Sequence, residues 1–286
     1  MKRQLLVLAC LLTAAASRPS PPPVVMGIQA WSEHVAIERD LAEGYRRLAS
    51  YGVKPVELYG LDGDGWHETK KQVRTNNLIP IAAHVSVDAL ANHGAEMVLR
   101  ARKMGVRYLG LAWLKSQGAT PGGLTVAEAD RATAAFNGFC RLARKAGITP
   151  FLHLHGYEFV RDPDGAGTML DRLLAKVPAR CMAIEIDVFW VVRAGQDPMA
   201  LLRRYGRRVV FLHLKQPVAG MPVDDSGGIA PGHETALGEG PVEWTALLAE
   251  ARRQGVRAAF IEDETGDPAA NLPRSIAYLR SIGAIR

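Results

Sequence analysis

The sequence predicts an α/β protein with a single (β/α)8 TIM barrel, and two observations predict it. One pattern recurs along the chain: basic residues, a glycine, a β-branched residue and a short apolar run, as in RKMGVRYLGLAW, RKAGITPFLHLH and RRQGVRAAFIED. Basic residues and glycine are typical of a helix C-terminus, and the apolar run after them is typical of a buried parallel strand. In addition, eight such runs occur, and amphipathic segments follow most of them.

In chain order, the runs expected to be strands are Val24–Trp31, Pro55–Tyr59, Leu78–Val85, Tyr108–Trp113, Thr149–His155, Cys181–Asp187, Val209–Lys215 and Ala258–Asp263. The segments expected to be helices include Asp88–Met104, Thr125–Ala146, Pro198–Tyr205 and Val242–Gln254. The second connection, around His67–Asn77, is short. A doubly wound open sheet is the alternative, but it does not need eight similar units. No glycine-rich phosphate loop follows the first run, which argues against dinucleotide binding.

The N-terminal residues are expected to lie outside the barrel. Lys2 and Arg3 precede an apolar stretch, and Ala14–Ala16 supplies small residues for cleavage, which predicts a signal peptide over residues 1–16. Cys10 leaves a lipoprotein as the alternative. Residues 17–23 form a proline-rich linker, so the barrel is expected over 24–286. We therefore expect a secreted or periplasmic protein without stable insertion in a membrane.

Composition excludes several classes of protein. With 48% hydrophobic and 22% charged residues the chain is globular rather than disordered. The net charge of +6 is scattered along the sequence, which argues against a nucleic acid partner. Cys140 falls in an expected helix and Cys181 at the head of an expected strand. Buried free thiols are the simplest interpretation of this pair, and a disulfide stays open.

Polar residues end most of the apolar runs, in pairs two residues apart. Because strand side chains alternate with period two, both members of a pair share one face. The pairs are Gln29 and Trp31, Glu57 and Tyr59, His153 and His155, Glu185 and Asp187, His213 and Lys215, and Glu262 and Glu264. Barrel enzymes hold their active sites at this end of the strands, and buried carboxylates are usually paired or metal-bound. These pairs, with His84 and Trp113, predict a metal or acid/base site.

Several motifs resemble those of one superfamily. They are HLHGYEF, EIDVFWVVRAGQDP, FLHLKQP, LGEGPVEW and FIEDE, together with GIQAWS and AAHVSVDAL. The chain resembles the xylose isomerase-like barrel superfamily, in the branch usually labelled sugar phosphate isomerase/epimerase, over nearly all of its length after the linker.

The resemblance implies one divalent metal at the barrel mouth. The implied ligands are Asp187, His213, Glu262 and, from the fifth strand, Glu158, with His155 as its competitor. This oxygen-rich set suits Mn²⁺ first, with Mg²⁺, Zn²⁺ or Co²⁺ as alternatives. The chain departs from the branch pattern in three places. Leu154 replaces an Asn and is expected to point outward, whereas Gln216, in place of an Asp, and the Glu-Asp-Glu ending are expected to alter groups near the metal.

A metal at this place would acidify the C–H beside a ketone. Glu158 and Glu262 are expected to carry the proton, with His155 as an acid/base and Lys215 as partner of the oxyanion. Lys215 could instead pair with Asp187 or Glu185. The residues expected to bind substrate are His84, His153, Trp31, Trp113, Glu57 and Glu239.

Export disfavours a phosphorylated substrate, so cleavage of 3-keto-glycosides is the leading prediction. Isomerisation or epimerisation of an unphosphorylated keto-sugar is the alternative, and a non-catalytic sugar-binding protein is the remote one. The glycine-rich segment Gln216–Gly240 is expected to cover the site as a lid, with His233, Glu234 and Glu239 completing it; a passive surface loop is the other interpretation. A homodimer stays open.

Overall fold

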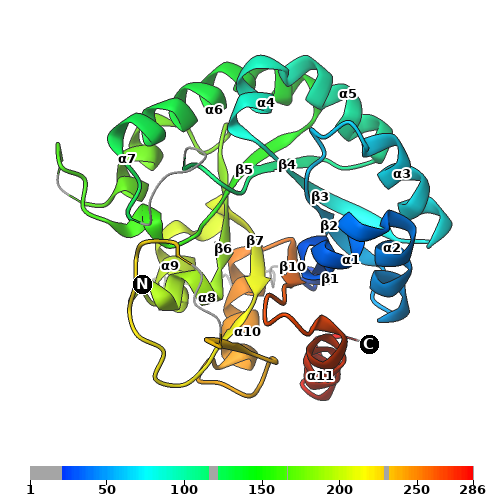
Figure 1. Cartoon of the computed structure of the whole chain (residues 1–286). Helices are drawn as coiled ribbons and strands as arrows, with labels where there is room; N and C mark the ends of the chain where they lie inside the picture. Colours follow the sequence, from blue (N-terminus) through cyan, green and yellow to red (C-terminus); the bar gives the residue numbers. More distant parts are fainter. Residues whose placement is uncertain (1–20, 116–121, 166, 229–231, 286) are drawn as a thin grey trace, which may run out of the picture.

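The computed structural model describes residues 21–115, 122–165, 167–228 and 232–285. The predicted signal peptide, residues 1–16, lies outside the described residues. Within them, eight parallel strands close into a barrel in the order β1-β10-β7-β6-β5-β4-β3-β2, and helices surround it (Figure 1). The barrel strands are β1 (Val25–Gln29), β2 (Pro55–Leu58), β3 (Ile79–Val85), β4 (Tyr108–Leu111), β5 (Thr149–His153), β6 (Ala183–Asp187), β7 (Val209–Leu214) and β10 (Ala258–Ile261). The predicted fold class is confirmed.

Six of the predicted runs extend one or two residues past the observed end of the strand. Trp113, His155 and Lys215 therefore lie just past their strands, and Trp31 lies in a short 3-10 helix over Ala30–Glu33. The shorter strands leave unchanged the prediction that polar residues gather at the carboxyl ends of the strands.

The described helices are α1 (His34–Arg39), α2 (Leu41–Ser50), α3 (Trp66–Thr75), α4 (Val87–Asn92), α5 (Gly94–Met104), α6 (Val126–Ala146), α7 (Met169–Lys176), α8 (Val188–Arg193), α9 (Pro198–Tyr205), α10 (Trp244–Gln254) and α11 (Pro268–Ser281). The helix predicted over Asp88–Met104 is two helices, because the chain leaves helical geometry at His93. The start of α5 packs closely on α6, since a Cβ at Gly94 would lie 2.9 Å from the ring of Phe139. Among the described helices, none has both the length and the apolar character needed to cross a bilayer.

The lower part of the barrel interior is apolar. Phe151, Phe211 and Phe260 fill it together with small alanines on neighbouring strands. Glycine is required beside these rings: a Cβ on Gly110 would lie 2.3 Å from the ring of Phe151, and one on Gly27 would lie 2.7 Å from that of Phe260. Because side chains alternate with period two, the next inward residues on these strands form the layer above. Leu154 faces the other way, into the core between strands and helices, as predicted.

Cys140 on α6 and Cys181, just before β6, form a disulfide with a Cα–Cα separation of 4.9 Å. The simplest interpretation from sequence, two free thiols, is therefore wrong. Both residues are buried. The bond ties α6 to the segment just before β6, the strand that carries Glu185 and Asp187.

Replacing both cysteines, Cys140→Ser with Cys181→Ser, is expected to lower the free energy of unfolding by about 4 kcal/mol, because the bond closes a loop of 41 residues. Guanidinium unfolding under non-reducing conditions measures the loss. Dithiothreitol should destabilise the parent protein by a similar amount and leave the double variant unchanged. Equal stability of the two proteins without reductant would contradict the bond.

Candidate metal centre and active site

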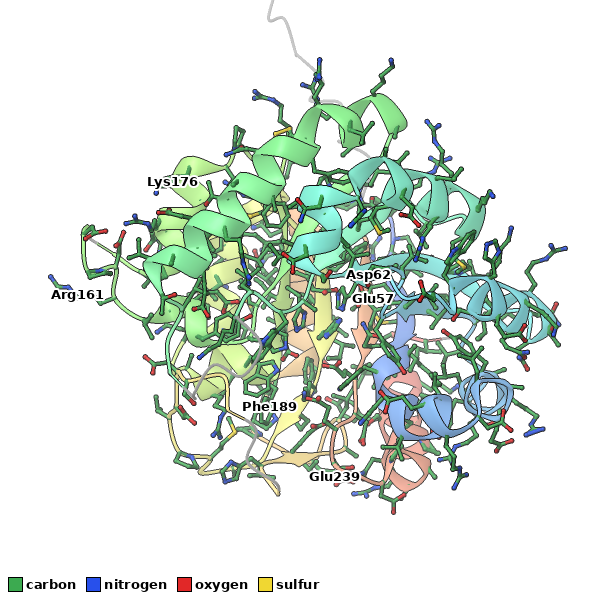
Figure 2. The ribbon with its side chains drawn as sticks, turned by 45° about the horizontal axis from the view of Figure 1, so that its top comes forward. Glu57, Asp62, Arg161, Lys176, Phe189 and Glu239 are labelled. Carbon is green, nitrogen blue, oxygen red and sulfur yellow. A yellow bond between two sulfur atoms is a disulfide. The ribbon has the colours of Figure 1, made fainter. Side chains whose placement is uncertain are left out.

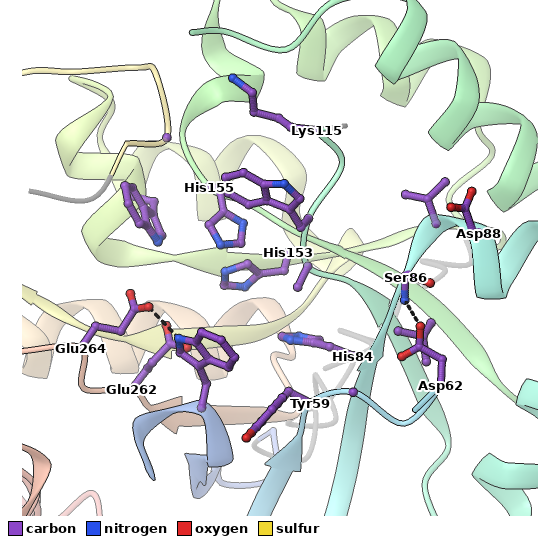
Figure 3. Close-up of a pocket in the computed structure, with 18 of the residues that line it drawn as sticks. Tyr59, Asp62, His84, Ser86, Asp88, Lys115, His153, His155, Glu262 and Glu264 are labelled. Atoms are coloured by element: carbon purple, nitrogen blue, oxygen red, sulfur yellow. Dashed lines mark hydrogen bonds between the residues drawn. The ribbon is translucent and has the colours of Figure 1, made fainter. Parts of the chain in front are cut away.

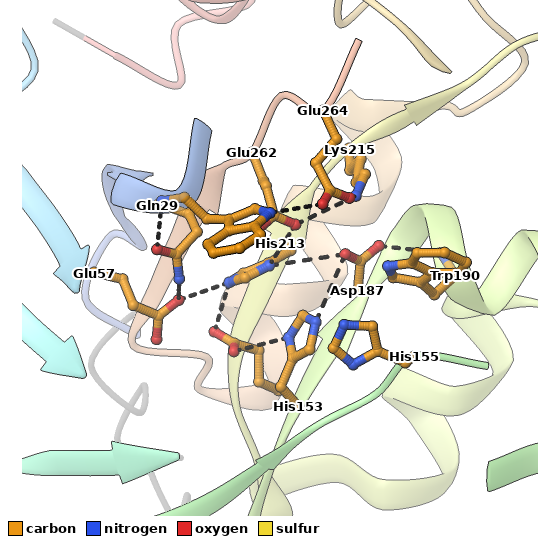
Figure 4. Close-up of polar contacts among 12 residues, drawn as sticks. Gln29, Glu57, His153, His155, Asp187, Trp190, His213, Lys215, Glu262 and Glu264 are labelled. Carbon is orange, nitrogen blue, oxygen red and sulfur yellow. Dashed lines mark hydrogen bonds and ion pairs between the residues drawn. The ribbon is translucent and has the colours of Figure 1, made fainter. Parts of the chain in front are cut away.

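A layer of buried polar side chains lies above the phenylalanines. It consists of Glu57, His84, His153, Glu185 and His213, all of them buried. Figure 4 shows Glu57, His153 and His213 of this layer. Glu185 Oε2 accepts hydrogen bonds from His84 Nε2 at 3.1 Å and from His153 Nδ1 at 3.0 Å. The sequence placed Glu185 among the polar pairs at the strand ends but gave it no role of its own in the site.

His213 is held in one orientation by Glu57. Its Nε2 donates to Glu57 Oε2 at 2.6 Å, and the same oxygen accepts from Gln29 Nε2 at 2.8 Å. We predicted that Glu57 binds substrate. In the structure this buried carboxylate instead orients the imidazole of His213. Figure 2 places Glu57 well inside the barrel.

The other nitrogen of His213 faces two carboxylates. Nδ1 lies 3.2 Å from Glu262 Oε2 and 3.8 Å from Asp187 Oδ2. Burial lowers the pKa of His213, but the charges of Glu185 and Glu262 outweigh it and raise the pKa well above the usual value. The electrostatic field at this ring therefore favours a positive charge.

One oxygen of Asp187 accepts a hydrogen bond, whereas the other, Oδ2, lies 3.8 Å from His213 Nδ1 and 3.9 Å from His153 Nε2. Its Oδ1 accepts from the backbone N–H of Trp190 at 3.1 Å and so caps α8. Its Oδ2 is buried without a hydrogen-bond partner. A buried carboxylate oxygen left in this way is costly unless a cation satisfies it.

Asp187, His213 and Glu262 bring one ligand atom each within 4.8 Å of one another. Two carboxylates and an imidazole, with one unpartnered carboxylate oxygen among them, fit a divalent cation. The structure thus brings together three of the four predicted ligands. A second group within the same limit, His84, His153, Glu185 and His213, shares His213 with the first.

The predicted fourth ligand, Glu158, does not join this group. Its carboxylate accepts from the backbone N–H of His155, at 3.1 and 3.3 Å, and so closes the short 3-10 helix at Tyr157–Phe159. It is fully buried and does not line the pocket described below. The geometry therefore gives Glu158 a structural place, and its predicted roles as ligand and proton carrier have no support there.

Burial raises the pKa of Glu158 to about 8, although backbone N–H groups oppose the rise. A carboxyl group with a raised pKa in the folded state stabilises the protein fully below its unfolded pKa. That contribution is lost as the pH rises through about 8.

Glu158→Gln is therefore expected to be more stable than the parent protein at pH 8.5. The difference in free energy of unfolding between variant and parent should be larger at pH 8.5 than at pH 5, by an amount on the order of 4 kcal/mol. Denaturant unfolding at pH 5, 7 and 8.5 measures this difference. A difference that does not change with pH would contradict the buried, protonated state of Glu158.

His155, the competing candidate, lines the pocket, and its Nδ1 is buried without a hydrogen-bond partner. Its ring lies 4.5 Å from that of His153 and 5.2 Å from that of Trp113. Burial lowers the pKa of His155 to about 3, so the ring is neutral near pH 7 and keeps a lone pair. Neither His155 nor Glu158 belongs to the two groups of ligand atoms within 4.8 Å, and of the two only His155 lines the pocket.

Lys215 is buried between two carboxylates that line the pocket. Its Nζ lies 3.5 Å from Glu262 Oε2 and also pairs with Glu264, whereas the predicted alternatives were Asp187 or Glu185. It also lies 5.2 Å from the ring centre of Trp190. Glu264, which the sequence placed among the polar pairs at the strand ends without a role of its own, also accepts from Trp31 Nε1 at 2.8 Å and so joins the segments that follow β1 and β10.

A pocket of about 920 Å³ opens over this centre (Figure 3). Of the predicted residues, those that line it are Trp31, His84, Trp113, His153, His155 and Glu262. Asp187 and His213 are fully buried behind this lining. The pocket thus lies at the carboxyl ends of the strands, where the sequence placed it.

Glu239 does not belong to this pocket. It is exposed and pairs with Arg274 of α11, at the edge of the molecule (Figure 2). The family motif placed Glu239 near the site along the chain but did not fix the direction of its side chain. Arg274, 35 residues later, does so.

The segment Gln216–Gly240 reaches the site through other residues. It holds the antiparallel pair β8 (Gln216–Pro217) and β9 (Glu234–Thr235), and its Gly227 and Gly228 line the pocket. Glu234 accepts from the backbone N–H of Glu264 at 3.1 Å.

Gln216 itself accepts from Trp244 Nε1 at 2.6 Å and from the backbone N–H of Gly238. It therefore ties the segment to α10. The sequence had led us to expect that Gln216 alters groups near the metal, and these contacts do not support that expectation. His233 hydrogen-bonds to Arg193 at 2.9 Å.

Comparisons place the chain among known proteins. The model of a family described as xylose isomerase-like TIM barrel matches residues 45–282. A sugar phosphate isomerase/epimerase from Parabacteroides distasonis has a TM-score of 0.68 and 20% identity, over 96% of this chain and 100% of that chain. The 3-keto-D-glucoside 4-epimerase from E. coli has a TM-score of 0.61 and 12% identity, over 90% and 99%.

The IOLI protein, whose structure holds a zinc atom, has a TM-score of 0.61 and 11% identity, over 91% of this chain and 96% of that chain. At such identities these structures show a common fold. No curated protein sequence is similar to this chain. The family match spans most of the barrel, and on that ground the chain belongs to the xylose isomerase-like TIM barrel family.

Proposed function

We propose that this protein is an exported, divalent-metal-dependent enzyme that removes a proton beside the ketone of an unphosphorylated keto-sugar, and that it cleaves 3-keto-glycosides. The observation that carries the proposal is the buried group of Asp187, His213 and Glu262 behind a pocket of about 920 Å³. Its unpartnered acceptor, Asp187 Oδ2, supports a bound cation. Mn²⁺ remains our leading choice, with Mg²⁺, Zn²⁺ and Co²⁺ as alternatives.

Asp187, His213, Glu262 and His155 would hold the cation, which would polarise the ketone and acidify the neighbouring C–H. Glu262 lines the pocket and stays ionised: burial opposes its charge, but Lys215 and His213 hold the pKa of Glu262 well below its usual value. We assign the carboxylate of Glu262 as the group that accepts the proton. Lys215 supplies the positive charge that compensates the oxyanion.

The cleavage balances without an added oxidant. The C2 proton passes to Glu262, the C2–H electron pair forms the C1–C2 double bond, and the C1–O bond breaks with its electrons on the leaving oxygen. That oxygen takes up the proton and departs as an alcohol. Addition of water across C1–C2 then gives the free 3-keto-sugar, so the net reaction is hydrolysis.

One feature supports export of the protein, and a second supports an unphosphorylated substrate. The disulfide between Cys140 and Cys181 is typical of oxidising compartments, in agreement with the signal peptide that the sequence predicts. The pocket lining includes four carboxylates, those of Asp62, Asp88, Glu262 and Glu264, against the two cations Lys115 and Arg131, and this excess of negative charge disfavours a phosphate.

Epimerisation is the second candidate, and the fold shared with the 3-keto-D-glucoside 4-epimerase from E. coli favours it. Epimerisation at C4 would begin with removal of the C4 proton, on the other side of the ketone, and end with return of a proton to the opposite face. The two functions therefore differ in which proton beside the ketone is removed and in whether a bond to a leaving group breaks.

The test is incubation of the purified, metal-loaded protein with methyl 3-keto-glucoside in D₂O, followed by a chelator and NMR spectroscopy. Release of methanol without an epimer is the expected result. An epimer without methanol would replace cleavage by epimerisation. No reaction with any of the four metals, and no bound metal, would overturn both and leave a sugar-binding protein.

A further inference from the structure

The pocket has two ends that come from different strands. His155, Glu262 and Glu264, at the metal end, follow β5 and β10. The other end consists of Asp62 after β2 and of Ser86 and Asp88 after β3, and Figure 3 shows these three across the pocket from Glu262 and Glu264. The volume of about 920 Å³ is near the upper limit of ~300–1,000 Å³ for small-molecule sites, so the pocket has room beyond a single sugar ring.

The end away from the metal offers hydrogen-bond acceptors on one wall. Asp62 Oδ2 accepts from the backbone N–H of Ser86 at 3.0 Å, which fixes the Asp62 carboxylate at the rim. Asp88 is exposed in the first turn of α4. Ser86 Oγ accepts from the backbone N–H of Ala89 at 3.1 Å as the cap of α4, and its own hydroxyl hydrogen can donate to a ligand.

The pocket lining also offers hydrogen-bond donors and, beside His155, an aromatic ring. Arg131 donates to the backbone carbonyl of Leu114 at 3.1 Å, and Lys115 donates to that of Gly122. Both cations line the pocket, as does Trp113, which is 46% exposed. An open indole face is a surface on which the apolar face of a pyranose ring can pack.

This mixture of groups selects among classes of leaving group. The carboxylates of Asp62 and Asp88 would repel an anionic leaving group. An apolar leaving group would cover these carboxylates without offering them hydrogen bonds, which is unfavourable. A sugar hydroxyl both donates and accepts, so a neutral sugar ring can satisfy the carboxylates and the cations together.

We propose that Asp62, Ser86 and Asp88 form a subsite for a second, neutral sugar ring, so that the preferred substrate is a keto-disaccharide. The inference rests on the proposed function, which places the keto-sugar at the metal end. The second ring is the group that cleavage releases.

The experiment compares kcat/KM for a 3-keto-glucosyl-glucose with kcat/KM for methyl 3-keto-glucoside. We expect the parent protein to prefer the disaccharide by at least tenfold, and Asp88→Ala to lower that ratio about tenfold. Asp64→Asn is the matched control, since Asp64 lies on the same loop as Asp62, is exposed, and does not line the pocket. Equal kcat/KM for both substrates in the parent protein, or the same ratio in Asp88→Ala and Asp64→Asn, would overturn the subsite.

Saturation-transfer NMR with cellobiose and with glucose separates this proposal from the proposed function. Transfer to both rings of cellobiose, weakened in Asp88→Ala and kept in Asp64→Asn, supports the subsite even where no keto-sugar is cleaved. Cleavage of methyl 3-keto-glucoside together with transfer to one ring only would keep the proposed function and refute the subsite.

Discussion

Asp187→Asn is expected to abolish retention of a divalent metal and to lower kcat/KM by roughly 10³-fold or more, while the barrel stays folded. The substitution changes one oxygen of a buried carboxylate to an amide NH₂ and removes its negative charge.

The two oxygens of Asp187 have separate tasks, and this explains the expected selectivity. Oδ1 caps α8 through the backbone N–H of Trp190, and the carbonyl oxygen of an asparagine caps equally well. Oδ2 is buried without a partner and faces His213 Nδ1 at 3.8 Å. An amide nitrogen in that place cannot serve as a ligand, because it has no lone pair to offer.

Asp197→Asn is the matched control. Asp197 Oδ1 caps α9 through the backbone N–H of Met199 at 2.8 Å, but the residue is exposed and does not line the pocket. Elemental analysis of both variants, with circular dichroism and activity, separates loss of a cap from loss of a ligand. Full metal content and activity in Asp187→Asn would remove Asp187 from the centre.

The barrel could be predicted because each strand is an apolar run with a clear start. Burial of both faces gives such runs, and the glycine and basic residues before them mark the preceding helix end. The ends of the strands were less certain. At Trp113 and His155 the side chain still belongs to the site, but the backbone has left the sheet.

The centre itself was predicted where strand alternation decides which way a residue points. Asp187 and His213 lie in β6 and β7 and face inward for that reason, and Glu262, one residue past the end of β10, lies with them. Glu158 and Glu239 lie on loops, where the direction of a side chain depends on partners far away or on local turns. Neither the backbone N–H of His155 nor Arg274 is visible as a partner in the sequence.

The supporting layer was predicted only in outline. Glu185 and Glu57 fall on the inward face of their strands, so the sequence placed them near the site. The depth of a residue within the barrel decides whether its side chain contacts substrate or orients a metal-ligating side chain. That depth follows from how far the phenylalanine layer fills the barrel beneath them, and the sequence did not show it.

Lys215→Met is expected to destabilise the protein by about 3–5 kcal/mol and to abolish activity, because it leaves buried carboxylates without their cation. Lys215 is 1% exposed and pairs with both Glu262 and Glu264. Methionine is unbranched and apolar, so most of the loss should come from charge rather than from packing. Denaturant unfolding and kcat/KM measure the two effects.

A double-variant cycle separates stability from catalysis. Glu264→Gln keeps an acceptor for Trp31 Nε1 and removes one of the two carboxylates. Lys215→Met with Glu264→Gln should therefore recover part of the lost stability without recovering activity, since Glu262 still lacks its compensating charge. Recovery of activity in the double variant would show that Lys215 serves only to neutralise Glu264.

The exposed ion pair of Arg274 and Glu239 provides the comparison that fixes the scale. Arg274→Met should change the free energy of unfolding by less than about 1 kcal/mol, because water replaces the lost partner at the surface. If Lys215→Met costs as little as Arg274→Met, then Lys215 is hydrated in solution and the carboxylates beside it do not depend on its charge. A loss several times larger would mean that one buried cation holds Glu262 ionised in the pocket, as proton removal by that carboxylate requires.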